Sequence, residues 1–188
     1  MKDEISRIFE EHSDLIRESS ENLTEKIIEV TELILNAYKK DKKVLIAGNG
    51  GSASDAQHIA AELSGRFYKD RDPLFAEALH VNSSYMTAVA NDYGYDETYA
   101  RMTKAAGRKG DILIGISTSG DSSNVVKALQ KANEIGMTTI GFTGESGGKM
   151  KEICNILINV PSKDTPRIQE AHILIGHIIC QLIEEELF

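Results

Sequence analysis

The chain has 188 residues, close to one ordinary domain, with 41% hydrophobic and 27% charged residues and a net charge of -8. This composition excludes a disordered or fibrous chain, and the acidic balance argues against broad nucleic-acid binding, which requires many Lys and Arg side chains at phosphates. No apolar run approaches the roughly 18 residues of a membrane span, and the charged first ten residues do not resemble a signal peptide, so we expect a soluble cytoplasmic protein.

Residues 1–40 carry apolar side chains at helical spacing in two groups. The first group includes Ile5, Phe9 and Ile16, and the second includes Leu23 and Val30. We therefore predict an N-terminal pair of amphipathic helices ahead of any strand. No linker or repeat divides the rest of the chain, so residues 1–188 are expected to form a single domain on which this pair packs.

After residue 40, short apolar runs alternate with helical patterns. Strands are predicted over 43–47, 76–81, 111–117, 138–142 and 155–160. Helices are predicted over 52–66, 83–90, 95–106, 122–135 and 167–187, the fourth of them ending at Gly136. This alternation predicts an α/β fold, a doubly wound parallel five-stranded sheet covered by helices on both faces. Ligands then belong at the carboxyl ends of the strands, near the point where strand order reverses. The two cysteines, Cys154 and Cys180, lie in apolar stretches without CxxC spacing and are expected to be buried thiols.

The loop after the first predicted strand is rich in glycine. Its sequence, Gly48-Asn49-Gly50-Gly51-Ser52-Ala53, formally matches the G-x-G-x-x-A dinucleotide fingerprint. In a dinucleotide domain this unit starts the fold, and an acidic residue ends the second strand, whereas here helices come first and Glu77 precedes the apolar strand residues. A tight turn whose glycines are steric necessities is a second interpretation, and a small-ligand loop at a helix N-terminus is the third.

The loop after the third predicted strand is rich in hydroxyls. It reads Ser117-Thr118-Ser119-Gly120-Asp121-Ser122-Ser123 and leads directly into a predicted helix. Hydroxyls and free backbone N–H groups at a helix N-terminus form an anion site without any basic side chain. Simple capping would need only Asp121 or Ser122 and would leave Ser117 and Ser119 unexplained. We therefore expect this loop to bind phosphate.

Five ionisable or amide side chains are candidates for chemistry. His58 and Glu62 stand four apart, so they share one helix face and could hold one cation, although this spacing by itself favours an ordinary surface ion pair or hydrogen bond. Gln169 and His177 lie on the apolar closing helix, eight residues apart, which is roughly 12 Å along the axis and about 80° around it. The two side chains could contact the same atom only with strain, unless they belong to different subunits or the helix begins near Gln169. His172, on the same helix, is a competing candidate or a satisfied core histidine.

The segments that carry these residues resemble one known family. They are GNGGSASDAQHIAAELSGRF at 48–67, ANDYGYDETYAR at 90–101, GDILIGISTSGDSSNVVKAL at 110–129 and RIQEAHILIGHIICQLIE at 167–184. Together they resemble the sugar isomerase (SIS) fold family, and within it the sedoheptulose 7-phosphate isomerases, or phosphoheptose isomerases. The resemblance implies a flavodoxin-like SIS domain and a homotetramer that the N-terminal helices help to build, with active sites at subunit interfaces.

The same resemblance assigns the site residues by motif. It implies sugar contacts from the glycine loop and a second segment (Asn49, Gly50, Gly51, Asn91 and Asp92) and phosphate contacts from the hydroxyl loop (Ser117, Thr118, Ser119 and Ser122). It implies one zinc ion at His58, Glu62, Gln169 and His177, with Glu62 and Gln169 also touching substrate. Asp121 departs from the family, which often has Asn there. A carboxylate facing the phosphate would repel it, so Asp121 is expected to cap the helix or face solvent.

The implied reaction converts D-sedoheptulose 7-phosphate to D-glycero-D-manno-heptose 7-phosphate, the first step of nucleotide-activated heptose biosynthesis. An aldose-ketose isomerase moves a proton between C1 and C2 through an enediol. We expect Glu62 as the base on carbon, His177 as its acid/base partner, and zinc to polarise the oxygens. The alternative is a non-catalytic SIS protein that binds a sugar phosphate or another protein. The presence of both Glu62 and His177 favours the enzyme.

Overall fold

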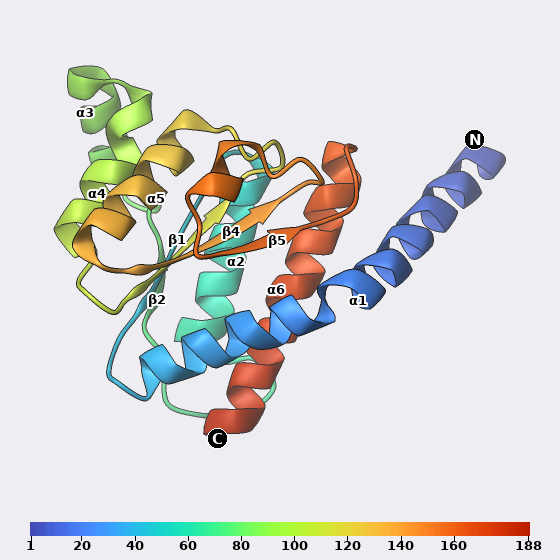
Figure 1. The fold of residues 1–188 in the computed structure, drawn as a ribbon, viewed down its shortest axis with the longest axis horizontal. Helices are drawn as coiled ribbons and strands as arrows, with labels where there is room; N and C mark the ends of the chain where they lie inside the picture. Colours follow the sequence, from blue (N-terminus) through green and yellow to red (C-terminus); the bar gives the residue numbers. More distant parts are fainter.

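A parallel sheet with helices on both faces forms the body of the molecule (Figure 1). The computed structural model describes residues 1–188. The elements in chain order are α1 (Lys2–Tyr38), β1 (Val44–Gly48), α2 (Gly51–Ser64), β2 (Ala76–Ala78), α3 (Ser83–Tyr93), the 3-10 turn η1 (Tyr95–Glu97), α4 (Thr98–Ala106), β3 (Ile112–Ile116), α5 (Ser123–Ile135), β4 (Thr138–Thr143), the 3-10 turn η2 (Gly148–Glu152), β5 (Ile156–Asn159) and α6 (Thr165–Leu187). No helix combines the length and apolar composition needed to cross a membrane.

The five strands are parallel and follow the order β2-β1-β3-β4-β5. This order confirms the predicted doubly wound, flavodoxin-like sheet. After β2 the chain crosses back past β1 to form β3, so strand order reverses between β1 and β3. The two strands are in register from Val44 opposite Ile112 to Gly48 opposite Ile116. Their carboxyl ends therefore lie side by side at the switch point of the sheet.

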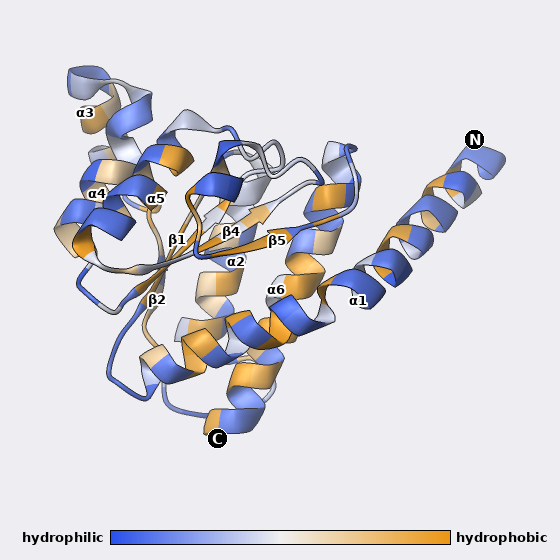
Figure 2. Cartoon of the chain, in the orientation of Figure 1, coloured by the Kyte–Doolittle hydropathy of each residue, from blue (hydrophilic) through white to orange (hydrophobic).

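Two apolar cores lie on the two faces of the sheet. Every residue of β1 and β3 is buried, as expected for strands covered on both sides. Side chains such as Ile46 and Ile114 face a core shared with α1, α2 and α6, whereas Leu45 and Leu113 face a core shared with α4 and α5. Figure 2 shows the apolar colour concentrated on the strands and on the inner sides of these helices. Both cysteines are free, as predicted, with Cys180 buried and Cys154 half-buried.

The predicted N-terminal helical pair is wrong, because residues 2–38 form one continuous helix. The residues between the two apolar groups, 17–22, contain neither Gly nor Pro, so nothing there ends the helix. The first half of α1 projects from the body and leaves Ile5 and Phe9 exposed (Figure 1). Two smaller differences concern β2, which ends at Ala78, and the predicted 95–106 helix, whose first turn is the 3-10 turn η1.

Candidate active site

The two predicted ligand loops meet at the switch point of the sheet. The glycine loop leaves β1 at Gly48 and enters α2, and the hydroxyl loop leaves β3 at Ile116 and enters α5. A reciprocal amide pair joins them, because Asn49 Nδ2 donates to Asn124 Oδ1 over 2.8 Å and Asn124 Nδ2 donates to Asn49 Oδ1 over 2.9 Å. The two loops are thus one structural unit, as the prediction from parallel strands requires.

The amide of Asn49 is held by residues that the sequence motifs did not reveal. Asn124 is 2% exposed, and the Tyr95 hydroxyl donates to Asn49 Oδ1 over 3.0 Å. The hydroxyl of buried Tyr99 donates to the Gly48 carbonyl at the end of β1. One feature of the sequence could have revealed Asn124. This polar residue directly precedes the apolar pair Val125 and Val126, and it is buried like them. Gly50 has a positive φ of 56°, which agrees with a tight turn that glycine permits.

The hydroxyl loop gathers its serines at the N-terminus of α5. Ser117 Oγ lies 2.9 Å from Ser122 Oγ and 3.4 Å from Ser119 Oγ. Ser122 is the N-cap residue, but its side chain caps no backbone N–H group of the helix. The Val125 N–H donates to Asn124 Oδ1 over 3.0 Å, but the N–H groups of Ser123 and Asn124, together with the positive end of the helix dipole, can serve an anion. Thr118 and Ser119 also line a polar cavity of about 190 Å³ that extends toward the start of α6.

Asp121 faces solvent, in agreement with the expectation for this departure from the family pattern. Its Oδ1 accepts a hydrogen bond from the backbone N–H of Lys149 over 3.1 Å. The carboxylate thereby ties the hydroxyl loop to the first turn of η2 and caps that turn rather than α5.

His58, Glu62 and His177 form a cluster at the contact between α2 and α6. His58 Nε2 lies 3.0 Å from Glu62 Oε1, and His177 Nε2 lies 3.4 Å from His58 Nε2. The two imidazole rings meet edge to face with centroids 4.8 Å apart. One potential ligand atom from each residue lies within 4.8 Å of the others. The structure therefore brings together the two helices whose side chains the sequence proposed for proton transfer.

The charges of the cluster suit both a proton shuttle and a cation. Partial burial, and then the charge of His58, lower the pKa of His177, while Glu62 opposes the shift. A His177 with a lowered pKa is neutral near pH 7 and can accept a proton. Two imidazoles and one carboxylate are also the donor set of many catalytic zinc sites, which keep a fourth position open. One turn before His58, Asp55 has a buried carboxylate oxygen without a partner, and burial raises the pKa of this group.

Gln169 lies apart from this cluster within one chain. A Cβ built on Gly51 would lie 2.7 Å from Gln169 Nε2 and 2.9 Å from Oε1, so the amide packs against the first residue of α2. Gly51 precedes His58 by seven residues, which is about 10 Å of helix. Because α6 begins at Thr165, Gln169 already stands in the second turn, so the strain anticipated from the eight-residue spacing is present.

The remaining candidate residues lie outside the His58–Glu62–His177 cluster. Asn91 and Asp92 are exposed on α3 and bond to each other, with no hydrogen bond to either ligand loop. His172 is fully buried, and its Nε2 lies 3.1 Å from the Thr143 carbonyl oxygen. Burial lowers the pKa of His172 to about 4, so it is a neutral core histidine and does not compete with His177.

Comparisons with known proteins agree on one family. The model of the SIS domain matches residues 8–144. A phosphoheptose isomerase from Clostridium acetobutylicum is 55% identical over 164 residues, 87% of this chain and 84% of the relative. The solved phosphoheptose isomerase of Neisseria gonorrhoeae superimposes with a TM-score of 0.93 at 41% identity, covering 98% of both chains. That of Francisella tularensis gives 0.94 at 36% identity and 97% of both.

Proposed function

This chain belongs to the SIS-domain family of phosphoheptose isomerases, and from that premise we propose how its residues perform the reaction. The protein is an aldose-ketose isomerase that converts D-sedoheptulose 7-phosphate to D-glycero-D-manno-heptose 7-phosphate. The observation that carries this function is the convergence of a carboxylate from α2 and an imidazole from α6, with His58 between them, in a chain whose switch point offers an anion site.

The hydroxyl loop is proposed to bind the phosphate end of the sugar. Ser117, Thr118, Ser119 and Ser122 supply hydroxyls, and the first N–H groups of α5 supply backbone donors. The oxygen of the Ser117 hydroxyl is already within reach of two neighbouring hydroxyls, so the group is preorganised. The glycine loop (Asn49, Gly50 and Gly51), together with Asn91, Asp92 and Gln169, is proposed to contact the sugar itself.

Glu62 and His177 are proposed to move the protons. In the ketose-to-aldose direction, Glu62 takes the proton from C1, and a proton returned to C2 completes the aldose. His177 moves the second proton from the oxygen on C1 to the oxygen on C2. Over the whole reaction C1 and its oxygen each lose one proton, and C2 and its oxygen each gain one. Glu62 Oε1 faces His58, and no side chain of the protein bonds to Oε2, which leaves this oxygen for substrate.

His58, Glu62 and His177 fit a zinc ion. Gln169 is proposed as a fourth ligand that comes from another subunit, because Gln169 of the same chain packs at Gly51, seven residues before His58. When bound, zinc supplies a Lewis acid that polarises the carbonyl and hydroxyl oxygens of the sugar. A ligated carboxylate is a weaker base than a free one, because the cation stabilises its charged form. Two oxygens on Glu62 allow the two roles to be divided.

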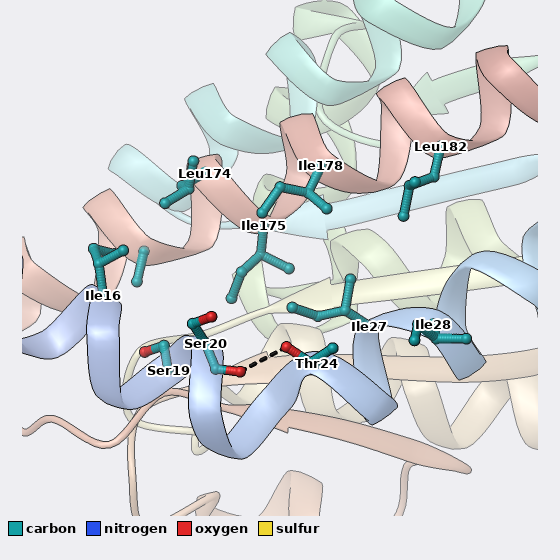
Figure 3. A pocket seen from close by; sticks show the side chains of 11 residues that line it. Ile16, Ser19, Ser20, Thr24, Ile27, Ile28, Leu174, Ile175, Ile178 and Leu182 are labelled. Carbon is teal, nitrogen blue, oxygen red and sulfur yellow. Dashed lines mark hydrogen bonds between the residues drawn. The ribbon is translucent and has the colours of Figure 1, made fainter.

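The proposed assembly is a homotetramer with active sites at subunit interfaces. Its support is an apolar groove of about 250 Å³ between α1 and α6, whose lining includes Ile16, Ile28, Leu174 and Ile178 (Figure 3). Ile28, Leu174 and Ile178 are exposed in the single chain, and Ile178 directly follows His177. A second subunit on this surface would bury these side chains beside the site and could bring its Gln169 toward His177.

A single assay tests the function. Purified protein is incubated with sedoheptulose 7-phosphate, and aldose formation is followed without chelator, with chelator, and after addition of zinc. We expect product, loss of activity with chelator, and recovery with zinc. Absence of product under every condition would favour the non-catalytic binding protein. Unchanged activity in chelator would retain the isomerase and refute the metal.

A further inference from the structure

A buried ion pair lies next to the His58–Glu62–His177 cluster and takes no part in the proposed chemistry. Arg71 Nε lies 3.0 Å from Glu184 Oε2, and both side chains are 2% exposed. A buried ion pair is a weak source of net stability, because desolvation of the two charges offsets their attraction. The role of this pair is therefore better argued from the hydrogen bonds that the two side chains form with the backbone.

Glu184 fixes the backbone that follows α2. Its carboxylate accepts hydrogen bonds from the N–H groups of Phe67 (3.0 Å), Tyr68 (2.7 Å) and Lys69 (2.6 Å), in addition to the bond from Arg71. Burial alone would raise the pKa of Glu184, but these bonds outweigh burial and lower it. The carboxylate thus stays ionised and holds three consecutive residues of an irregular segment in one conformation.

Arg71 caps the end of the helix that carries Glu62. Its guanidinium donates to the Glu62 carbonyl over 2.9 Å and to the Leu63 carbonyl over 2.9 Å. These carbonyls belong to the last turn of α2, where no intrahelical partner is available. A cation at this position also complements the negative end of the helix dipole. Arg71 therefore anchors the backbone of the proposed base.

The Arg71–Glu184 pair is also connected to His177, through Phe67. The Phe67 ring, whose backbone Glu184 holds, lies against the His177 ring with centroids 5.7 Å apart and a tilt of 31°. The His177 ring thus has two ring neighbours, Phe67 and His58. Glu184 follows His177 by seven residues, so it lies about two turns farther along the same face of α6.

We propose that Arg71 and Glu184 are positioning residues of the isomerase: the pair sets the distance between Glu62 and His177 by tying the end of α2 and Phe67 to α6. The proposal rests on the proposed function, because it concerns the same proton-transfer pair. Neither residue touches substrate. Loss of the pair is expected to misplace the two reacting groups, and a misplacement of about 1 Å can cost about a hundredfold in rate.

The first variant is Glu184→Gln, which keeps the shape of the side chain but replaces one acceptor oxygen by a donor. Its control is Glu186→Gln on the same helix, because the Glu186 side chain is exposed and forms no hydrogen bond. At a temperature where circular dichroism shows both variants folded, we expect kcat of Glu184→Gln to fall about tenfold to a hundredfold with little change in KM. Glu186→Gln should match the wild type. A folded Glu184→Gln with wild-type kcat would overturn the proposal.

Phe67→Leu provides the second variant, because it leaves the ion pair intact and removes the ring that faces His177. Phe75→Leu is its control, since Phe75 is 57% exposed and its ring does not pack against Phe67 or His177. We expect a loss of kcat in Phe67→Leu and none in Phe75→Leu. If Glu184→Gln does not fold, this comparison decides the matter, and equal kcat values would refute the positioning role.

A spectroscopic measurement separates this proposal from the reaction itself. The ring protons of His177, assigned with His177→Gln, are followed by NMR in metal-free and substrate-free protein. The nearby Phe67 ring should shift them, and Glu184→Gln should move the shift toward that of Phe67→Leu. An inactive wild type with this behaviour would refute the function and keep the positioning role. An unchanged His177 signal in Glu184→Gln would refute the positioning role alone.

Discussion

Glu62 and His177 differ in surroundings, and this difference supports the roles proposed for them. Glu62 is 23% exposed in its side chain, with one oxygen facing His58 and the other free. The pKa of His177 is lowered by burial and by His58, so this imidazole is neutral at neutral pH and can accept and return a proton. A neutral imidazole next to a carboxylate is suited to the transfer between two oxygens that an enediol mechanism requires.

Replacement of Glu62 by Gln should remove turnover and leave binding of the sugar phosphate nearly intact. Loss of a general base costs about 10²–10⁴-fold, and the amide cannot accept the proton from carbon. The measurements are kcat by product formation and Kd by calorimetry. Glu32→Gln on the exposed side of α1 is the control. A Glu62→Gln enzyme that keeps more than about a tenth of kcat would remove Glu62 from the role of base.

His172 predicts a pH dependence of stability. The pKa of this imidazole is about 4 in the folded chain, against 6.5 for an ordinary histidine, because it is buried. The unfolded chain binds a proton as pH falls below 6.5 and the folded chain does not, so the contribution of this group to stability is complete above pH 6.5 and declines toward pH 4. At about 1.4 kcal/mol per pH unit, the loss reaches about 3 kcal/mol.

The measurement is the free energy of unfolding in denaturant at pH 7.5 and pH 4.5. The comparison of wild type with His172→Gln isolates the group, because other side chains titrate in both. The wild type should lose more stability on acidification than the variant. Parallel losses in the two proteins would contradict the assignment of His172 as a neutral core residue.

At the scale of elements, two helices far apart in sequence run side by side in the same direction. Gln169 packs at Gly51, His177 at His58, and Glu184 at Phe67, so the offset between α2 and α6 stays close to constant. Both helices pack on the same face of the sheet, and their side chains are in contact along the length of α2. The cluster is therefore a property of a helix pair rather than of one motif.

The hydroxyl loop depends on a glycine at its turn. Gly120 has a φ of 72°, and a Cβ at this residue would lie 2.2 Å from the backbone oxygen of Gly147. We expect Gly120→Ala to destabilise the protein by about 1–3 kcal/mol and to weaken binding of sugar phosphate, because the clash moves the loop itself. Thermal unfolding and calorimetric titration measure the two effects.

Gly136→Ala is the matched control for this substitution. Gly136 also has a positive φ, of 85°, but a Cβ there meets only the flexible Lys109 side chain, 3.3 Å away. The control should lower stability through backbone strain and leave the affinity for sugar phosphate unchanged. Equal affinity losses in the two variants would show that the Gly120 contact does not shape the loop.

At the scale of the whole molecule, the separation of Gln169 from His177 argues for sites shared between subunits. Variants Glu62→Gln and Gln169→Ala should each be inactive alone, yet a mixture unfolded and refolded together should regain part of the activity. The recovery arises because one chain supplies the intact helix cluster and another supplies Gln169.

The control for this experiment is a mixture of Glu62→Gln with His177→Gln. These two residues belong to one cluster within one chain, so co-refolding creates no intact cluster and no recovery is expected. Recovery in this mixture, or its absence in the first, would contradict the proposed division between subunits. Size-exclusion chromatography with light scattering measures the accompanying oligomeric state.

Local patterns in the chain determined the sheet, its order of elements, the two ligand loops and the pairing of His58 with Glu62, because apolar periodicity and helix spacing act within a few residues. The single helix α1 was missed because apolar spacing shows which face of a helix is buried but does not show where one helix ends and the next begins. Tertiary structure decided the rest. Three contacts join residues more than 70 positions apart, and no local signal encodes them: the meeting of Glu62 with His177, the burial of Asn124 against Asn49, and the Arg71–Glu184 pair. Only the family resemblance predicted the first of these. All three depend on how helices pack on a finished sheet, which the chain specifies only as a whole.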